Sequence, residues 1–432
     1  MATLPFIVMA VAFGVFLWLA LLIQRKTGNL NTNRLLLIIF LLGLACRLAF
    51  VFGTPTFYAP DEQSHYNYIR YIADHGSLPV QTSQTGAATN DWEYYQPPLY
   101  YLALTPVYTV SAALFDDTGA VVCMLRLISV LLWLVTVWFA MRFLEVLGIR
   151  DKFLSLVVFC VVCLLPTYTF LSSAINNDNL LLALSAILLF SIARPHFTDN
   201  SGLVTGVLLG LAVLTKLTAV ILCFAYALIL LIEAVRQPDR RRIVFRHFIT
   251  AGSTATLLVM PWVIRNVIIY HSITAEYVAN VPREWPSYLI ALYHVLKGML
   301  FTFWSVSGIH NNVGSLFPAV GCLLTIVAGL GLVLTVRSVG RIKEVIPGDR
   351  QRWFFIAMGI AFVVNAILVL RFGLLYAQGQ GRFLFPLLLP EALLLGVGLR
   401  YYRLKYLDVH VAGLFLTYVI GFTLYSLMAF HT

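Results

Sequence analysis

The sequence predicts an all-α polytopic membrane protein, and its composition and hydropathy pattern lead to that class. The chain has 432 residues, of which 60% are hydrophobic and only 11% are charged, whereas a soluble domain has about 25% charged residues. Its mean hydropathy is +0.87, and apolar runs of about 20 residues, the length needed to cross a bilayer, recur along it. No long polar stretch remains in which a large soluble domain could fold. This excludes a soluble enzyme held by a single anchor.

Short polar breaks divide the chain into about 12 predicted transmembrane helices, which form a single domain over residues 1-432. The predicted spans are 3-23, 34-53, 121-142, 153-172, 179-194, 202-215, 217-235, 248-270, 314-336, 353-371, 383-399 and 409-428. Two further apolar stretches, 97-115 and 286-304, contain Pro, Tyr, Trp or His and are expected to lie at the membrane interface.

The distribution of Lys and Arg predicts which side of the bundle faces the cytoplasm. The formal net charge is +10, and in a membrane protein such an excess indicates topology before it indicates nucleic acid, because Lys and Arg collect in cytoplasmic loops. Most of them fall on one side when both termini and two long loops, 54-120 and 271-313, are placed outside. The residues assigned to the cytoplasmic side are Arg25, Lys26, Arg34, Arg142, Arg150, Lys152, Arg194, Arg236, Arg240, Arg241, Arg242, Arg246, Arg337, Arg341, Lys343, Arg350, Arg352, Arg400, Arg403 and Lys405.

The six cysteines lie inside apolar runs, so we expect no disulfide, because disulfides form in oxidising aqueous compartments. Cys160 and Cys163 have the spacing of a redox or zinc motif. Their segment, VVFCVVCLLP, offers no His or carboxylate partner, and we interpret the pair as core packing.

The first outer loop carries an acidic pair at the start of a predicted helix. In APDEQSHYNYIRYIADHG, the helix is expected to begin at Pro60, with Asp61 and Glu62 in the first turn, where acids suit the helix dipole. A charged helix start is therefore one interpretation. In the other, the apolar face of this helix holds the carboxylates at the outer bilayer surface, where one can act as general base toward a hydroxyl. His65 shares a face with Asp61, but zinc needs three or four protein ligands, so we expect no metal site.

The same loop continues with an aromatic segment, NDWEYYQPPLYYLALTPVY. Trp and Tyr prefer the interface depth of a membrane, so an aromatic belt would explain most of its composition. The functional interpretation is that Trp92, Tyr94, Tyr95 and Gln96 line a cavity shared with Asp61.

Basic residues near the outer ends of predicted spans indicate a site that handles an anion. Lys216 interrupts the apolar segment LLGLAVLTKLTAVIL, and an ammonium there needs an anion or the headgroup region. Arg382 follows Gln380 in a glycine-rich turn, QGQGR, and Arg binds phosphate in bidentate geometry. Arg265, in MPWVIRN, is a third candidate. Snorkelling or interfacial anchoring is the alternative for each.

Other polar residues of the outer face complete the predicted site. The segment SSAINNDNL precedes a span, and its side chains are expected to cap the helix or to bind substrate. The predicted substrate-binding residues are His65, Tyr66, Arg70, Tyr94, Tyr95, Gln96, Asp178, Trp304, His310 and Gln380.

Taken in order, these segments resemble the glycosyltransferase-C superfamily, whose multi-spanning enzymes use polyprenyl-phosphate-linked sugars. The resemblance is to the bacterial branch with the protein O-mannosyltransferases and the lipid A aminoarabinose transferases. The matching segments are PDEQSHYNYIRYIADHG, YYQPPLYYLALTPVY, MLRLISVLLWLVTVWFAMRFLEVLG, GLAVLTKLTAV, MPWVIRN, FTFWSVSG and QGRFLFPLLLP. It implies that Asp61 is the catalytic base, that Glu62 is its partner in the acidic pair, and that Lys216 and Arg382 contact the donor phosphate. The chain departs from the family pattern by an extra N-terminal span and by having no large C-terminal soluble domain.

The function implied is inverting transfer of a monosaccharide from a polyprenyl-phosphate carrier such as undecaprenyl phosphate to an acceptor hydroxyl. It would occur at the outer face of a bacterial inner membrane and need no cofactor, with a divalent cation not expected. The expected partners are the lipid-linked donor, a glycan, lipid or protein acceptor, and the bilayer, but no nucleic acid. One alternative is a lipid-linked polysaccharide polymerase or ligase. Another is a lipid or solute transporter, for which Glu391, inside a predicted span, is the residue of interest.

Overall fold

The computed structural model describes residues 4–82, 90–194, 198–274, 284–306, 316–338, 343–346 and 348–430, which form helices and connecting segments without strands. The helices are α1 (Leu4–Lys26), α2 (Thr32–Gly53), α3 (Glu62–His75), α4 (Leu99–Leu114), α5 (Thr118–Leu147), α6 (Lys152–Leu164), α7 (Pro166–Leu171), α8 (Asp178–Ala193), α9 (Asp199–Thr215), α10 (Val220–Arg236), α11 (Arg241–Tyr270), α13 (Tyr288–Trp304), α14 (Leu316–Arg337), α16 (Asp349–Tyr376), α17 (Leu388–Arg400) and α18 (Leu407–Ala429). Short 3-10 turns are η1 (Leu217–Ala219), η2 (Pro238–Arg240) and η3 (Gly381–Leu387).

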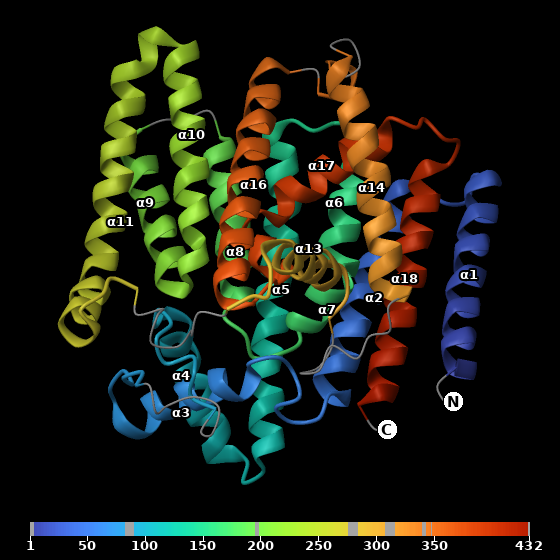
Figure 1. The fold of residues 1–432 in the computed structure, drawn as a ribbon. Helices are drawn as coiled ribbons and strands as arrows, with labels where there is room; N and C mark the ends of the chain where they lie inside the picture. Colours follow the sequence, from blue (N-terminus) through green and yellow to red (C-terminus); the bar gives the residue numbers. More distant parts are fainter. Residues whose placement is uncertain are drawn as a thin grey trace.

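The long helices run side by side as a bundle (Figure 1). Within the described residues, eight helices are long and apolar enough to cross a membrane, and shorter apolar helices, α6, α8 and α9 among them, stand between these. The predicted fold class, an all-α polytopic membrane protein, is confirmed, while the total number of spans stays a prediction. The cysteines are unpaired, as expected.

One predicted span is two helices. The segment 153-172 breaks at Pro166, which has no N–H and leaves carbonyls of the preceding turn without their helical donors. Arg47 of α2 replaces those donors: its guanidinium lies 2.7 Å from the carbonyl oxygen of Cys163 and 3.3 Å from that of Val162. This buried cation therefore closes a backbone break inside the bundle.

The helices predicted for the first outer loop are present at one end of the bundle. α3 and α4 pack on each other and on the end of α5, and α1 begins and α18 ends on the same side (Figure 1). Their contact is aromatic: the rings of Tyr68 and Tyr101 stack with centroids 3.8 Å apart. α3 begins at Glu62, so its predicted start at Pro60 was two residues early.

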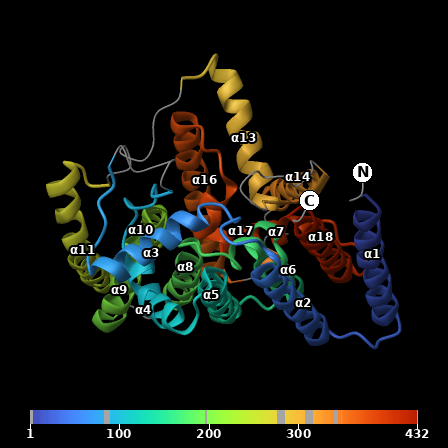
Figure 2. The same cartoon turned by 90° about the horizontal axis from the view of Figure 1, so that it is seen from below.

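α13 crosses the direction of the long helices, as the two views show (Figures 1 and 2). Its outward face is apolar, with Tyr288, Leu289 and Tyr293 all more than half exposed. An apolar helix in this orientation suits the membrane interface, and the interfacial position of 286-304 stays a prediction.

The helices of the bundle are interrupted at three places that face α3, and these places carry polar side chains. They are the turn between α7 and α8, the break between α9 and η1 at Lys216, and the loop from α16 into η3. In each of them the chain leaves helical geometry, so polar side chains gather at one level of an otherwise apolar bundle.

Candidate functional site

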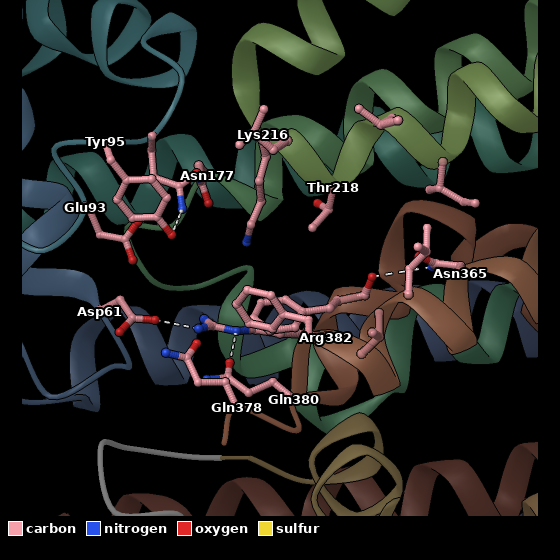
Figure 3. A pocket seen from close by; sticks show the side chains of 18 of the residues that line it. Asp61, Glu93, Tyr95, Asn177, Lys216, Thr218, Asn365, Gln378, Gln380 and Arg382 are labelled. Carbon is pink, nitrogen blue, oxygen red and sulfur yellow. Dashed lines mark hydrogen bonds and ion pairs between the residues drawn. The ribbon is translucent and has the colours of Figure 1, made fainter. Parts of the chain in front are cut away.

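A cavity of about 570 Å³ lies where these interruptions meet the first outer loop (Figure 3). Its lining residues are Asp61, His65, Trp92, Glu93, Tyr95, Gln96, Asn177, Lys216, Leu217, Thr218, Val220, Ile221, Asn365, Leu368, Val369, Phe372, Gln378, Gln380, Arg382 and Phe383. The cavity has a polar part, built by the loops, and an apolar part, built by α10 and α16.

Asp61 projects into this cavity from the residue that precedes α3. Its backbone is left-handed, with φ of 61°, and its side chain makes no cap hydrogen bond. The carboxylate instead accepts a hydrogen bond from Nη2 of Arg382 at 2.5 Å. Asp61 stands at the N-cap position of α3, but its carboxylate does not cap the helix and pairs with Arg382 instead.

Arg382 lies beside Asp61 and has one guanidinium nitrogen without a hydrogen-bond partner among the described residues. Its Nε donates to Oε1 of Gln380 at 2.6 Å and its Nη2 to Asp61, while the buried Nη1 has no hydrogen-bond partner in the described part of the chain. A buried donor without a partner costs free energy unless a ligand satisfies it. The guanidinium is thus ready for an anion.

Close backbone contact with α13 fixes the loop that carries Arg382. A Cβ on Gly379 would lie 2.7 Å from the carbonyl oxygen of Val295, and one on Gly381 would lie 2.3 Å from that of Met299. Only glycine fits at such distances. The amide of Gly381 also donates to Oγ1 of Thr302 at 2.6 Å. The turn therefore holds Gln380 and Arg382 against a rigid helix.

Lys216 reaches the cavity from the extended residue between α9 and η1. Its Nζ lies 2.6 Å from Oδ1 of Asp178, and both side chains are buried. Oδ2 of Asp178 has no partner among the described residues. Asp178 does not line the cavity itself, and the side chain of Asn177, the N-cap residue, makes no cap bond. Oδ1 of Asn176 accepts a hydrogen bond from the amide of Asp178, the first residue of α8, at 2.8 Å, so the helix-capping interpretation is confirmed for Asn176. Asp178 instead forms the buried ion pair that positions Lys216.

Glu93 is an ionisable site residue that sequence reasoning missed. It is buried, its Oε2 has no hydrogen-bond partner among the described residues, and it enters the cavity beside Asp61 (Figure 3). Burial, followed by the charge of Asp61, raises the pKa of Glu93 to about 8, although Lys216 and Arg382 act in the opposite direction. Glu93 is thus mostly protonated at neutral pH. The sequence does carry a signal for it: Glu93 is a carboxylate inside the aromatic segment whose other residues are predicted to line the cavity.

The surroundings of the cavity also shift the pKa values of Asp61 and His65. Burial acts to raise the pKa of Asp61, but the positive charges led by Arg382 outweigh it, so the net pKa lies below its usual range. Burial lowers the pKa of His65 to about 3, and the ring nitrogen Nδ1 lies 2.9 Å from the hydroxyl of Tyr101. The cavity therefore holds an ionised carboxylate, a neutral carboxyl and a neutral imidazole at pH 7.

Glu62 does not line the first cavity and makes a separate ion pair with Arg126. Its two oxygens lie 2.8 and 2.6 Å from Nε and Nη2 of Arg126, and Oε1 also accepts the amide of Ile175. Nη1 of Arg126 donates to the carbonyls of Val51 and Thr54. This fully buried pair ties α3 to α2, α5 and the turn before α8.

A second cavity, of about 220 Å³, adjoins the first. It is lined by Phe57, Ala59, Pro60, Asp61, Glu62, Gln63, Asn90, Trp92, Thr167, Leu171, Thr302, Val306, Gln380 and Arg382. Four of these residues, Asp61, Trp92, Gln380 and Arg382, also line the first cavity. They form the wall between the two.

The structure brings some predicted residues to the first cavity and leaves others outside it. Those that line it are Asp61, His65, Tyr95, Gln96, Lys216, Gln380 and Arg382. Those that line neither cavity are Tyr66, Arg70, Tyr94, Asp178, Arg265 and Trp304. Arg265 donates to the carbonyl of Pro79, and Trp304 to Oγ1 of Thr325. His310 lies outside the described residues.

Among the described residues, no three His, Cys, Asp or Glu side chains are grouped so that they could hold a metal ion. The expectation of a metal-independent site therefore stays a prediction.

The chain matches a family model described as a predicted membrane protein (DUF2142) over residues 69–390. No curated protein matches it.

Solved structures share its fold. One is ArnT from Cupriavidus metallidurans bound to undecaprenyl phosphate, with 13% identity and a TM-score of 0.56 over 85% of this chain and 60% of that one. ArnT from the same organism in the apo state gives a TM-score of 0.54 over the same shares. The Archaeoglobus fulgidus oligosaccharyltransferase tethered with an acceptor peptide gives 13% identity and a TM-score of 0.50, over 91% of this chain and 55% of that one.

This chain spans about 60% or less of the length of these proteins. The likenesses confirm the predicted glycosyltransferase-C fold.

Proposed function

The chain belongs to the DUF2142 family of predicted membrane proteins, and from its fold and cavity we propose that it is an inverting glycosyltransferase. It moves a monosaccharide from a polyprenyl-phosphate carrier to an acceptor hydroxyl at the outer face of a bacterial inner membrane. The observation that supports this most is one cavity that joins a partnerless guanidinium nitrogen, an ammonium and an ionised carboxylate to an apolar wall.

The apolar part of the cavity suits the start of a polyprenyl chain. Val220 and Ile221 of α10 line it together with Leu368, Val369 and Phe372 of α16. α10 and α16 meet at their other ends, where Arg236 pairs with Asp349. The apolar lining at the opposite ends of the two helices can hold isoprene units, while the phosphate stays at the polar part.

The polar part suits the phosphate that leaves. Lys216 and Arg382 approach it from two elements. The ring centroid of Phe383 lies 5.5 Å from Nζ of Lys216 and 5.7 Å from Cζ of Arg382. Positive groups positioned in a site with little water stabilise the charge that develops on the leaving phosphate. Nη1 of Arg382 gives that phosphate a donor that no described residue uses.

The reaction is a displacement at the anomeric carbon. The acceptor oxygen forms a bond to C1 of the sugar, the bond from C1 to the phosphate oxygen breaks, and the phosphate keeps its electron pair. The proton of the acceptor hydroxyl goes to Asp61. Arg382 must loosen its bond to Asp61 as the phosphate binds, which raises the basicity of Asp61 when the donor is in place.

The two other carboxyl groups have different roles in this proposal. Glu93, neutral at pH 7, donates a hydrogen bond to the donor sugar and adds no negative charge beside Asp61. Glu62 positions Asp61 through its pair with Arg126 and does not touch substrate. No cofactor takes part, and the bilayer supplies the lipid-linked donor.

The test is transfer of labelled sugar from undecaprenyl-phosphate-linked donors by the purified full chain. Asp61→Asn is expected to lower the rate by about 100-fold or more, the size of a general-base contribution. Asp74→Asn is the matched control, because Asp74 is an exposed carboxylate on the same helix and pairs only loosely with Arg70. Equal rates for wild type and Asp61→Asn would reject the mechanism.

A further inference from the structure

The second cavity differs in chemistry from the first, and we infer that it binds the acceptor and takes an uncharged sugar ring. The inference rests on the proposed function, since it names the acceptor class for the same site. It begins from the position of the cavity against the wall that contains Asp61 and Arg382.

The position suits a nucleophile. In an inverting displacement the attacking oxygen and the leaving oxygen lie on opposite sides of the anomeric carbon. Lys216 and the apolar wall of α10 and α16 belong only to the first cavity, so the lipid phosphate has its place there. A hydroxyl seated in the second cavity reaches Asp61 from the other side of the shared wall.

The charges suit a neutral ligand. Among the described residues that line the second cavity, the ionisable ones are Asp61, Glu62 and Arg382. Asp61 and Arg382 pair with each other, and Glu62 pairs with Arg126. Arg382 is the one cation among these described lining residues, and in the proposed reaction it binds the donor phosphate. No second lining cation remains to neutralise a phosphate-bearing acceptor, and Glu62 is already paired. A charged acceptor would be desolvated there without a counter-ion, which is costly.

The remaining polar groups are amides and hydroxyls. The Asn90 side-chain amide donates to Oε1 of Gln63 at 2.9 Å, which orients the Gln63 amide so that its NH2 group is the end that can bind a hydroxyl. Thr167 also lines the cavity, and its hydroxyl donates to the carbonyl of Thr302 at 2.8 Å, so its oxygen can accept a hydrogen bond from a ligand. Amides, hydroxyls and an aromatic face, here from Trp92, are the groups that recognise a sugar by its hydroxyls and its ring.

The size points to a single ring. About 220 Å³ lies below the range of about 300 to 1,000 Å³ typical of pockets for larger ligands. An acylated lipid or a folded peptide would not fit, whereas one terminal sugar of a glycan would.

Backbone strain is gathered at the same cavity. Phe57, Asp61 and Asn90 have positive φ values of 63°, 61° and 55°, and all three line it. A non-glycine residue in the left-handed region is unfavourable, and such residues cluster at functional sites, where the surrounding structure holds them. Three residues that line the cavity therefore keep unfavourable backbone conformations, which a chance gap in packing would not require.

The experiment measures the binding of sugars to the full chain in lipid nanodiscs by saturation-transfer NMR. The probes are methyl glucoside and methyl mannoside, with glucuronate and glucosamine as charged counterparts. Gln63→Ala and Asn90→Ala alter the second cavity only, and Thr218→Ala, which lines the first cavity only, is the matched control. We expect the neutral glycosides to bind wild type and Thr218→Ala alike and about tenfold more weakly to the other two variants.

Two results would overturn the inference. One is equal or tighter binding of the charged probes. The other is loss of binding in Thr218→Ala with no loss in Gln63→Ala and Asn90→Ala, which would place the sugar in the first cavity.

Transfer assays separate this inference from the proposed function. With a neutral glycan acceptor, Gln63→Ala is expected to raise the acceptor KM about tenfold and to leave the donor KM unchanged. If sugar reaches only a charged lipid or a peptide, and Gln63→Ala has no effect, the inference fails while the transferase function stands. If neutral sugars bind through Gln63 but no lipid-linked sugar is consumed, the sugar site stands and the transferase function fails.

Discussion

Two arginine–carboxylate pairs sit on consecutive residues of the chain and have opposite characters. At Glu62, every nitrogen of the Arg126 guanidinium donates to a carboxylate or a backbone carbonyl, and both side chains are buried. At Asp61, the carboxylate is 25% exposed, and Nη1 of Arg382 has no partner within the described residues. A saturated pair has nothing left to offer a ligand, whereas an unsaturated one facing a cavity does. The first pair is structural, and we propose that the second binds a ligand.

The largest expected effect is on the saturated pair. Arg126→Met leaves Glu62 buried without its counter-ion, and breaking a buried pair in this way costs about 3 to 5 kcal/mol. We expect a large drop in the midpoint of thermal unfolding in detergent, or no folded protein. Arg70→Met is the control, because that arginine is exposed on α3, and its effect is expected to stay within about 0.5 kcal/mol. Equal midpoints for the two variants would show that the Glu62 pair is not structural.

The next effect is on ligand binding at the unsaturated pair. Arg382→Gln removes a charge-assisted hydrogen bond worth about 1.5 to 3 kcal/mol, so undecaprenyl phosphate should bind about 10- to 100-fold more weakly. Arg371→Gln is the control. Arg371 is an exposed arginine near the C-terminal end of α16 and lines neither cavity, so this variant should bind undecaprenyl phosphate as wild type does. Isothermal titration in nanodiscs measures both, and unchanged affinity in Arg382→Gln would remove the phosphate site.

A smaller, pH-dependent effect is expected at Glu93. Because its pKa is raised from 4.5 to about 8, the folded state favours the neutral form. The stability this contributes is present below about 4.5 and is lost as the pH rises through about 8. Transfer should also decline through about pH 8, as a second negative charge appears beside Asp61.

Glu93→Gln keeps the neutral form at every pH. Both the unfolding midpoint and the transfer rate of this variant should therefore lose the alkaline decline of wild type. An identical pH profile in the two proteins would show that Glu93 does not titrate in the cavity.

The smallest effect is expected at Glu391, the residue on which a transporter would depend. Both oxygens of this buried carboxyl lack partners among the described residues, yet it lines neither cavity. Glu391→Gln should therefore transfer sugar at a rate close to that of wild type. Altered lipid movement in this variant, with no transfer by wild type, would favour the transporter.

The comparison also shows how far sequence reasoning reaches. Lys216 and Arg382 could be found because a cation in an apolar segment needs an explanation. The same rule also selected Arg265, whose guanidinium donates to a backbone carbonyl instead. A sequence shows that a charge needs a partner but not whether the backbone supplies it.

Long-range partners explain the other differences. Glu62 resembles Asp61 in the sequence, and its role depends on Arg126, which only the packing of α5 brings to it. Glu93 escaped notice because its protonation is set by burial and by Asp61, both properties of the assembled site. The fold class, in contrast, was predictable, because apolar length and composition alone require a helical bundle in a membrane.

The most direct test of the central claim is a cryo-EM structure of the full chain with undecaprenyl phosphate bound. The account predicts phosphate density between Arg382 and Lys216, with the guanidinium of Arg382 shifted from Asp61 onto the phosphate and the pair of Glu62 with Arg126 unchanged. Phosphate density outside this cavity, with Arg382 still bound to Asp61, would contradict it.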